Sequence, residues 1–420
     1  MKILKEIVKI ICVLAGAVFL GTALLIFVYA LPTGRIKANV AKSSNIFDVE
    51  GTYPALIPGF QFAQLDNFTD SIMLGIAMYN GEESVSEKAM SNYRMRSDEL
   101  GIVKSTTHYA NDVEADYYRK GYQRYWHGYL IFLKPLLAFF TYGEIRLLNG
   151  MFQIAMSALA IKMMLKSRLK IYLPAYIAAF LFLNPATVSL SLQYSAIYNI
   201  MLVFIVLWLS LLERRRLLAE YVPFIFLAAG CITSYIDFLT YPIAVVGILA
   251  ILSINTWGSS RENVLRLFKN IIYWGIGYVG MWAGKWLAGS LILKQNLFKD
   301  ALWKLMFYSS ADGESSRRIE AIIKNIEVYN NKVYIGLLVL LVIYVIGSFV
   351  KNRIKVNKEH LREAGIYGII SFMPLVWMLF ASNHSEEHAW FVHRGLCVTV
   401  LALGCIYVYI RENCNIDCRK

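Results

Sequence analysis

The sequence predicts an all-α membrane protein that crosses the bilayer about ten times. Hydrophobic residues make up 57% of its 420 residues and charged residues only 17%, a balance that excludes an ordinary water-soluble protein of this length. The apolar residues gather in runs of about 17 to 25, the length that a helix needs to cross the hydrocarbon core. The basic residues, which give a formal charge of +13, lie in short clusters between these runs. They therefore orient a membrane chain and do not indicate nucleic-acid binding.

Ten apolar runs are candidates for transmembrane helices. The first follows a basic start, and its length favours an uncleaved signal anchor over a cleaved secretory signal. Asn184-Pro185 predicts a break in the third run, because proline disfavours a helical residue before it. The ten runs lie near residues 8–30, 143–163, 171–190, 196–212, 221–236, 239–254, 270–291, 333–350, 366–382 and 391–410.

The distribution of Lys and Arg orients these runs. If the amino terminus is cytoplasmic, every segment on the cytoplasmic side contains a cluster of basic residues. The short turns on the other side contain a single basic residue, Arg394. The sequence therefore predicts a multi-pass membrane protein with both termini in the cytoplasm. We expect the membrane to be a bacterial plasma membrane. Residues 1–420 form a single membrane domain, with residues 31–142 and 292–332 as its first and second extracytoplasmic loops.

The first of these loops contains two carboxylates one helical turn apart, in LDNFTDSIML (residues 65–74). On a helix, Asp66 and Asp70 share a face, where like charges raise the pKa of one of them. One interpretation is structural: Asp70 lies in the first turn of a helix begun by Thr69. The other is chemical, with Asp66 as a proton acceptor, because a helix start at Thr69 does not account for it. A divalent cation bound by both carboxylates stays open, although no third carboxylate lies nearby in the sequence.

The end of the first loop, residues 107–140, alternates cations with Tyr and Trp before a short apolar run. Tyr and Trp favour the headgroup level of a bilayer, where cations reach lipid phosphates. We therefore expect an amphipathic helix at the outer interface, and its candidates for phosphate binding are Arg119, Arg124 and His127. The alternative is an aromatic belt with no chemical role.

Two later places on the same side carry further candidates. The last turn, residues 381–396, contains three of the six histidines, and we expect His384, His388 and Arg394 to recognise a sugar or phosphate unless the turn is merely hydrated. Lys285 lies within an apolar run, where a charge is costly unless it faces protein or water. It either pairs with a lipid phosphate or extends to the interface.

The segments between the runs contain no glycine-rich nucleotide-binding motif. Those on the cytoplasmic side are also too short to hold a nucleotide-sugar domain. An activated sugar would therefore arrive on a lipid.

In its order of elements the chain resembles the GT-C superfamily of integral membrane glycosyltransferases. The residues that carry the resemblance are LDNFTD (65–70), YQRYWHGYLIFLKPLL (122–137) and NHSEEHAWFVHR (383–394), which are similar to those of membrane proteins from bacterial surface-polysaccharide clusters. The resemblance implies an inverting transferase that moves a sugar from a polyprenyl-phosphate donor to a glycan or lipid-linked acceptor, with no certain cofactor. It also implies that Asp66 is the base, with Asp70 as the second candidate. The residues implied to bind phosphate or sugar are Arg124, His127, Lys285 and Arg394.

Two other function classes stay open. A polysaccharide polymerase or ligase would also act on a lipid-linked donor, but such proteins tend to carry their large loop late in the chain. A transporter that flips a lipid-linked sugar would require polar residues through several spans and usually internal repeats. The long early loop favours the transferase.

Overall fold

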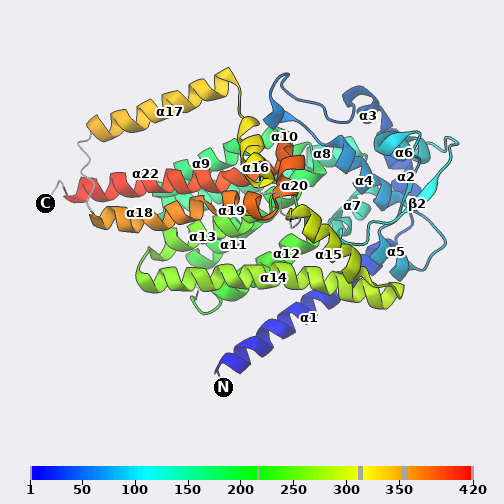
Figure 1. Cartoon of the computed structure of the whole chain (residues 1–420), viewed down its shortest axis with the longest axis horizontal. Coiled ribbons are helices and arrows are strands. Elements are labelled where there is room, and N and C mark those ends of the chain that lie inside the picture. The colour runs from blue at the N-terminus through cyan, green and yellow to red at the C-terminus, as the bar shows by residue number, and fades with distance from the viewer. Residues whose placement is uncertain (1, 215–217, 311–315, 352–357, 418–420) are drawn as a thin grey trace.

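The computed structural model describes residues 2–214, 218–310, 316–351 and 358–417. Nearly all regular structure in these residues is helical, with one ribbon of two strands. The helices form a long bundle that carries a smaller subdomain at one end (Figure 1). The predicted all-α class is therefore confirmed. We refer to the smaller subdomain, residues 31–141, as the cap.

Four helices in the described residues are long and apolar enough to cross a membrane. They are α1 (Lys2–Tyr29), α8 (Tyr142–Lys166), α11 (Leu192–Glu213) and the segment Ala389–Glu412, which contains most of α22 (Cys397–Asp417). A fifth span arises if α16 (Ser316–Glu327) and α17 (Lys332–Lys351), which are bent by 91° at their junction, cross as one unit. The structure thus supports a multi-pass membrane protein, but the predicted count of ten spans is not confirmed.

The remaining predicted runs are helical but shorter, broken or more polar. The predicted break is present at Asn184, whose φ of 56° separates two helices of the third run. The elements of these runs are η2 (Arg168–Tyr172), α9 (Leu173–Phe182), α10 (Pro185–Ser189), α12 (Val222–Ile236), α13 (Ile243–Trp257), α14 (Arg261–Leu293), α18 (Lys358–Ser371) and α19 (Met373–Phe380).

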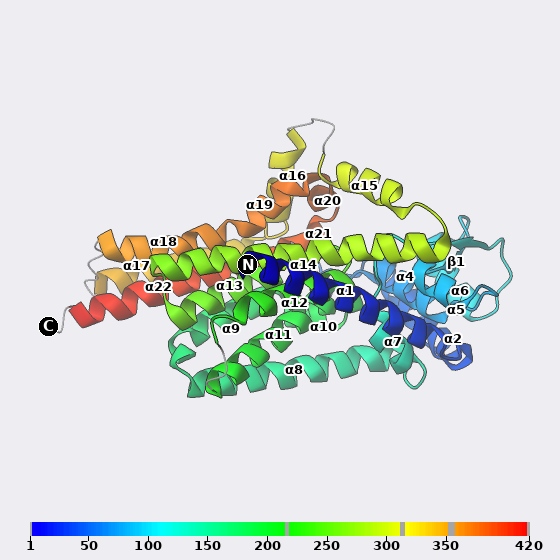
Figure 2. The ribbon, with the colours of Figure 1, turned by 90° about the horizontal axis from the view of Figure 1, so that it is seen from below.

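Helices α12 and α14 pack with their backbones in close contact. A Cβ on Gly230 would lie 2.1 Å from the carbonyl oxygen of Trp274, and a Cβ on Gly277 would lie 2.2 Å from that of Leu227. Only glycine fits at these two positions, a device that lets membrane helices approach closely. Helix α14 then continues along the bundle to the cap (Figure 2).

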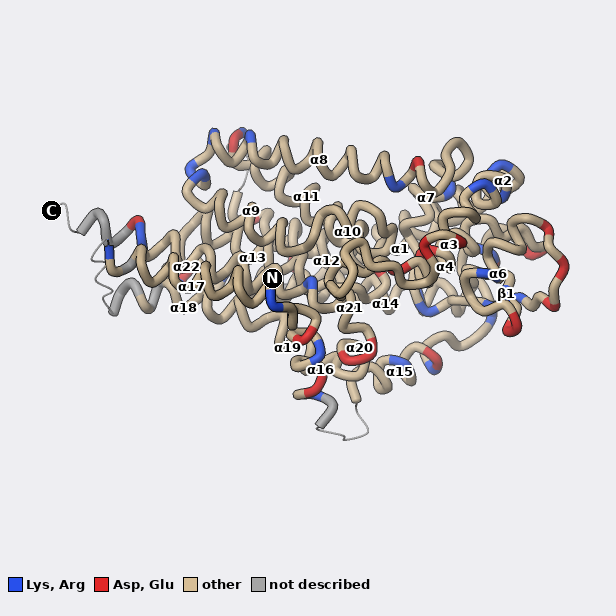
Figure 3. Tube along the Cα trace, turned by 90° about the horizontal axis from the view of Figure 1, so that it is seen from above, with Lys and Arg blue, Asp and Glu red and all other residues tan. Residues whose placement is uncertain are grey.

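Charged residues are distributed unevenly along the molecule. Charged residues gather at the cap, at the opposite end of the bundle, at the start of α1 and on the projecting α15 (Leu297–Tyr308), α16 and α20 (Ser382–Glu387), whereas α9–α13 between the two ends are mostly uncharged (Figure 3). An uncharged middle between two charged ends suits a hydrocarbon layer.

The cap has a hydrophobic core of its own, formed around Leu74, Ile76, Trp126 and Leu130. In the ribbon, β1 pairs antiparallel with β2 so that Arg94 lies opposite Lys120. The elements of the cap are α2 (Gly34–Lys42), α3 (Ser44–Glu50), η1 (Gln61–Ala63), α4 (Asn67–Met78), α5 (Val85–Ser91), β1 (Arg94–Arg96), α6 (Gly101–Ala110), β2 (Tyr118–Lys120) and α7 (Leu130–Leu137).

The expected amphipathic helix at the end of the first loop is wrong for most of its length. Residues 118–120 form a strand, residues 121–129 are irregular, and only α7 is helical after the end of α6. Trp126 is 1% exposed and donates its Nε1–H to the carbonyl oxygen of Met281 at 2.7 Å, so it packs in the core of the cap and not at a headgroup level. Burial in the cap and strand pairing override the local pattern of alternating cations and aromatics.

The second loop and the last turn lie together beside the cap. Helices α15 (Leu297–Tyr308) and α16 project from the same side of the bundle as α20 (Ser382–Glu387) (Figure 2). Two short elements, α21 (Ala389–Val392) and η3 (His393–Leu396), then lead into α22.

Candidate functional site

Asp66 caps the amino terminus of α4. Its Oδ1 accepts the backbone N–H of Thr69 at 2.8 Å, and the helix begins at Asn67. The expected start at Thr69 is therefore wrong, and so is the argument that a helix start leaves Asp66 unexplained. An N-cap aspartate uses one oxygen for the helix, so its second oxygen remains free for another partner.

The second oxygen of Asp66 faces the last turn of the chain. Oδ2 accepts the indole N–H of Trp390 at 3.3 Å, which joins the start of α4 to α21. Asp66 is only 1% exposed, and burial raises the pKa of its carboxyl group, while the hydrogen bonds from Thr69 and Trp390 oppose this rise. The raised pKa arises from burial and not from repulsion by Asp70, because the two carboxylates point to different partners.

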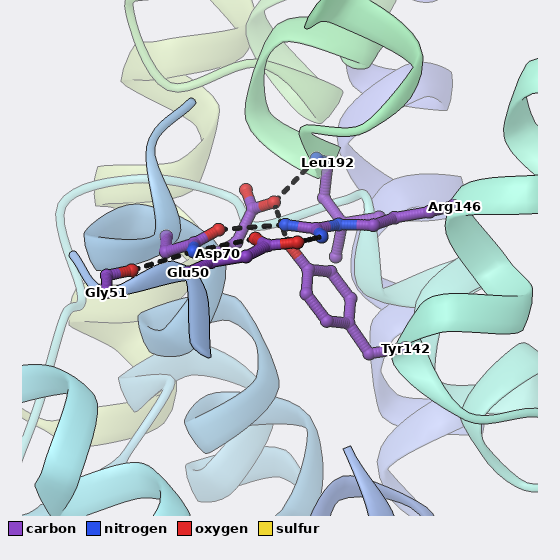
Figure 4. A network of polar contacts seen from close by, with 7 residues as sticks. Glu50, Gly51, Asp70, Tyr142, Arg146 and Leu192 are labelled. Carbon is purple, nitrogen blue, oxygen red and sulfur yellow. Dashed lines mark hydrogen bonds and ion pairs between the residues drawn. The ribbon is translucent and has the colours of Figure 1, made fainter. Parts of the chain in front are cut away.

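Asp70 has a structural role. Its Oδ2 accepts the hydroxyl of Tyr142 at 2.6 Å and the N–H of Leu192 at 2.9 Å (Figure 4). Its Oδ1 accepts the N–H of Gln193 at 3.1 Å. A carboxylate at the first N–H groups of α11 complements the dipole of that helix. Burial raises the pKa of Asp70 to about 6, against these hydrogen bonds. Asp70 therefore fastens the cap to α8 and α11.

A second set of contacts beside Asp70 reinforces this attachment. The guanidinium of Arg146 on α8 donates to Glu50 at 2.7 Å and to Asn67 at 2.8 Å, and Asn67 in turn donates to Glu50 at 3.0 Å (Figure 4). Arg146 is 5% exposed. Sequence reasoning missed this residue, although a cation inside a predicted apolar run was a signal that could have found it.

Arg394 lies close to Asp66 without forming an ion pair with it. Its Nη1 donates to the carbonyl oxygen of Trp390 at 2.7 Å and its Nη2 to that of Phe62 at 3.2 Å. Its guanidinium carbon lies 4.0 Å from the centre of the Tyr194 ring. Arg394 is fully buried, and its charge lowers the pKa of Asp66. A buried acid and a buried cation thus face the same small region.

Two polar atoms in this region lack a partner among the residues that the structure describes. They are Nε of Arg394 and the hydroxyl of Tyr194, and both are buried. A buried donor without an acceptor is costly, so this region suits a ligand with acceptor oxygens. Tyr53 covers one side of it, with its ring 5.7 Å from that of Trp390, and is 43% exposed. The region formed by Asp66, Tyr194, Trp390 and Arg394 is the candidate site.

Of the histidines in the last turn, His388 packs directly against a residue of this site, and His384 and His393 bond to the protein nearby. His388 packs its ring 5.0 Å from that of Trp390, and burial lowers its pKa to about 4. Nε2 of His384 donates to the carbonyl oxygen of Leu239 at 2.7 Å, and burial lowers the pKa of this histidine also. Nδ1 of His393 donates to the carbonyl oxygen of Ala389 at 2.8 Å. Both His384 and His388 are therefore neutral near pH 7 and provide no positive charge for an anion.

Arg119, Arg124 and His127 have protein partners away from the candidate site. Arg119 pairs with Glu83 and lies over the ring of Tyr93. His127 is buried and contacts the carbonyl oxygen of Tyr122 and the hydroxyl of Tyr129, each at 3.0 Å. None of the three forms a hydrogen bond or ion pair with Asp66, Trp390 or Arg394 in the part of the chain that is described.

Lys285 also has a partner within the protein, because it caps the carboxyl end of a helix. Its ammonium donates to the carbonyl oxygen of Met90 at 2.9 Å, in the last turn of α5, and Lys134 donates in the same way to Ala77 at the end of α4, at 2.7 Å. Cations stabilise the carbonyl end of a helix. Both lysines are fully buried, so Lys285 does not extend to the interface.

Comparison of the chain with protein-family models, with curated proteins and with solved structures finds no match. Among the described residues, no group of three or more His, Cys, Asp or Glu side chains is arranged to hold a metal ion. The functional argument therefore rests on the geometry of the candidate site.

We expect Arg124→Gln to have little effect. The Arg124 guanidinium pairs with both carboxylate oxygens of Asp300 at 3.0 Å and joins the cap to α15, but both side chains are partly exposed to solvent. An exposed ion pair contributes about 0–1 kcal/mol. Thermal unfolding in detergent should therefore shift by no more than a few degrees, and a double-mutant cycle with Asp300→Asn measures the coupling. A coupling well above this range would show that the pair is a main attachment of α15.

Proposed function

We propose that the protein is an inverting membrane glycosyltransferase that uses a polyprenyl-phosphate sugar as donor and a cell-surface glycan or lipid-linked glycan as acceptor. The observation that supports this proposal best is that the charge of Arg394, whose Nε has no partner among the described residues, acts on the buried Asp66 carboxylate. Inversion at the anomeric carbon needs a base on the acceptor side of the sugar and a cation on its phosphate side. The basic clusters toward the opposite end of the bundle favour an extracytoplasmic cap.

In the proposed reaction Asp66 is the general base. The acceptor oxygen attacks the anomeric carbon of the sugar from the face opposite the phosphate, and its proton passes to Oδ2 of Asp66. The bond from the anomeric carbon to the phosphate oxygen breaks, and its electron pair leaves with the lipid phosphate. Arg394 neutralises the charge on that phosphate, so the products are an inverted glycoside and the polyprenyl phosphate.

An apolar groove offers a place for the lipid chain of such a donor. It lies between α1 and α14, encloses about 660 Å³, and includes Val18, Gly284 and Leu291 among its lining residues. Its lining is apolar apart from Thr22. Such a surface suits a hydrocarbon chain and does not suit a sugar.

The test is a transfer assay with the full-length protein in proteoliposomes. A polyprenyl-phosphate sugar labelled in the sugar is supplied together with a glycan acceptor. We expect one labelled sugar per acceptor, in an inverted linkage, with release of polyprenyl phosphate. Growth of a long labelled chain would indicate the polymerase, and label that crosses the bilayer while still on its lipid would indicate the transporter.

Trp390→Phe should shift the acidic limb of the pH profile to higher pH. The base must be ionised, so kcat/KM falls as the pH falls through the pKa of Asp66, which burial has already raised. The indole N–H stabilises the ionised carboxylate, and its removal raises this pKa further. Profiles of kcat/KM for the two proteins provide the measurement. An unchanged acidic limb would show that the titration of Asp66 does not control the rate.

A further inference from the structure

A stretch of the cap away from the candidate site carries an excess of hydrogen-bond donors. Within residues 91–97, five residues carry six buried side-chain atoms that have no hydrogen-bond partner in the described part of the chain. Every one of these atoms can donate a hydrogen bond. The atoms are Oγ of Ser91, Nδ2 of Asn92, Nε and Nη1 of Arg94, Nε of Arg96, and Oγ of Ser97. Of these, Nε of Arg96 lies 3.0 Å from a carboxylate oxygen of Asp98, so its charge is already paired. The group that would complete this region is therefore an acceptor.

Arg94 is the centre of this region. It is 7% exposed, its guanidinium lies 5.7 Å from the centre of the Tyr122 ring, and it pairs with no carboxylate among the described residues. Burial lowers its pKa, and the next-largest influences are Tyr122, another cation in Arg96, and Tyr129. A buried arginine without an anion is costly, and proteins usually give such a group a carboxylate or a phosphate.

The ribbon adds a second, independent sign of a missing anion. Arg94 and Lys120 lie directly opposite each other in the antiparallel pair, so their side chains emerge on the same face. Like charges in this arrangement destabilise a ribbon unless an anion lies between or beside them. Arg96 follows on the same face, but Asp98 neutralises it at 3.0 Å, and no described carboxylate does the same for Arg94 or Lys120. Lys120 is exposed, whereas Arg94 is buried, so water reaches this face on the Lys120 side.

We propose that Arg94 and Lys120, with the donors of Ser91 and Asn92 nearby, bind an oxyanion, either a phosphate or a carboxylate, that reaches the cap from water. On the proposed function, on which this part of the inference rests, the oxyanion belongs to an anionic glycan acceptor. The lipid phosphate of the donor binds elsewhere, at Arg394. The cap would then select acidic acceptors over neutral ones.

The test is a titration of the purified full-length protein in detergent with inorganic phosphate and, separately, with glucuronate. Sodium chloride of equal ionic strength serves as the reference, and the readout is the midpoint of thermal unfolding followed by tryptophan fluorescence. We expect a saturable rise of the midpoint with at least one of the two anions. The anion that produces it identifies a phosphate-bearing or a uronate-bearing ligand.

Three variants make the test specific. Arg94→Gln should lower the affinity for the anion about 10-fold or more, because a charged hydrogen bond is lost. Lys120→Gln should lower this affinity about two- to fivefold, as expected for an exposed charge. Arg96→Gln is the matched control, because its cation is on the same face but is already paired, and it should bind as the wild type does. If Arg94→Gln does not fold, Lys120→Gln against Arg96→Gln decides the question.

Two outcomes would overturn the inference: no saturable effect beyond that of chloride, or an equal loss of binding in Arg96→Gln. The result is separable from the proposed function, because Asp66→Asn should lose sugar transfer and still bind the anion. If the wild type shows no sugar transfer, the proposed function fails, and the titration still decides whether the oxyanion site exists.

Discussion

Asp66→Asn should lower kcat/KM for sugar transfer by about 10²–10⁴-fold, the contribution typical of a general base. Asparagine caps a helix as well as aspartate does, so the bond to Thr69 and the start of α4 are retained. Its amide oxygen, in contrast, does not accept a proton at neutral pH. The measurement is the rate of transfer in proteoliposomes, with the unfolding midpoint in detergent as a check that the fold is unchanged.

The matched control for this variant is Asp237→Asn. Asp237 is also buried and also accepts two backbone N–H groups, those of Leu239 at 3.0 Å and Thr240 at 2.9 Å, in the turn between α12 and α13. It should retain transfer activity, because only its turn depends on it. Full activity in Asp66→Asn, or an equal loss in both variants, would exclude Asp66 as the base.

Asp70→Ala should destabilise the protein by several kcal/mol. The change leaves the hydroxyl of Tyr142 and two N–H groups at the start of α11 without their acceptor, and each unsatisfied buried group costs about 1–3 kcal/mol. Part of this cost is offset, because the alanine protein no longer buries a carboxyl group that burial disfavours. A loss of this size is a large share of the roughly 5–15 kcal/mol that stabilises a typical fold.

The half-life of the folded protein in detergent, together with its unfolding midpoint, measures this effect. Arg124→Gln is the reference, since it removes an exposed contact of the cap and should change little. The remaining folded Asp70→Ala protein should transfer sugar at a rate closer to that of the wild type than Asp66→Asn does. If Asp70→Ala is as stable as Arg124→Gln, Asp70 does not hold the cap on the bundle.

The apolar runs were predictable because hydropathy depends on residues that are neighbours in the chain. The sequence located the helices and the break at Asn184, but the number of crossings depends on how long, straight and apolar each helix is. The prediction of an amphipathic interface helix was wrong for a different reason. Its alternation of cations and aromatics is the same whether Trp126 lies in lipid headgroups or in a protein core, and only the contact with Met281 distinguishes the two.

The candidate site was predictable only in outline. Placing residues 65–70 and 383–394 on one side of a membrane was enough to expect them near each other, and Asp66 does bond to Trp390, 324 residues later. The partners of each cation were not predictable, because nothing local to Lys285 indicates the helix end at Met90. The role of Tyr194 was not predictable either, because tyrosines are common near the start of a membrane span. Only the contact of Arg394 with its ring indicates a place in the site.

The two buried lysines bear on the order in which the chain matures during translation. Helix α4 obtains its terminal ammonium group from Lys134, 57 residues later, so that part of the cap is complete early. The carbonyl end of α5 is capped only by Lys285, 195 residues later. The carbonyl oxygen of Phe62 accepts from Arg394, 332 residues later. Until those residues have been synthesised, the carbonyl groups of Met90 and Phe62 lack these donors, so this part of the cap is completed only with the second half of the chain.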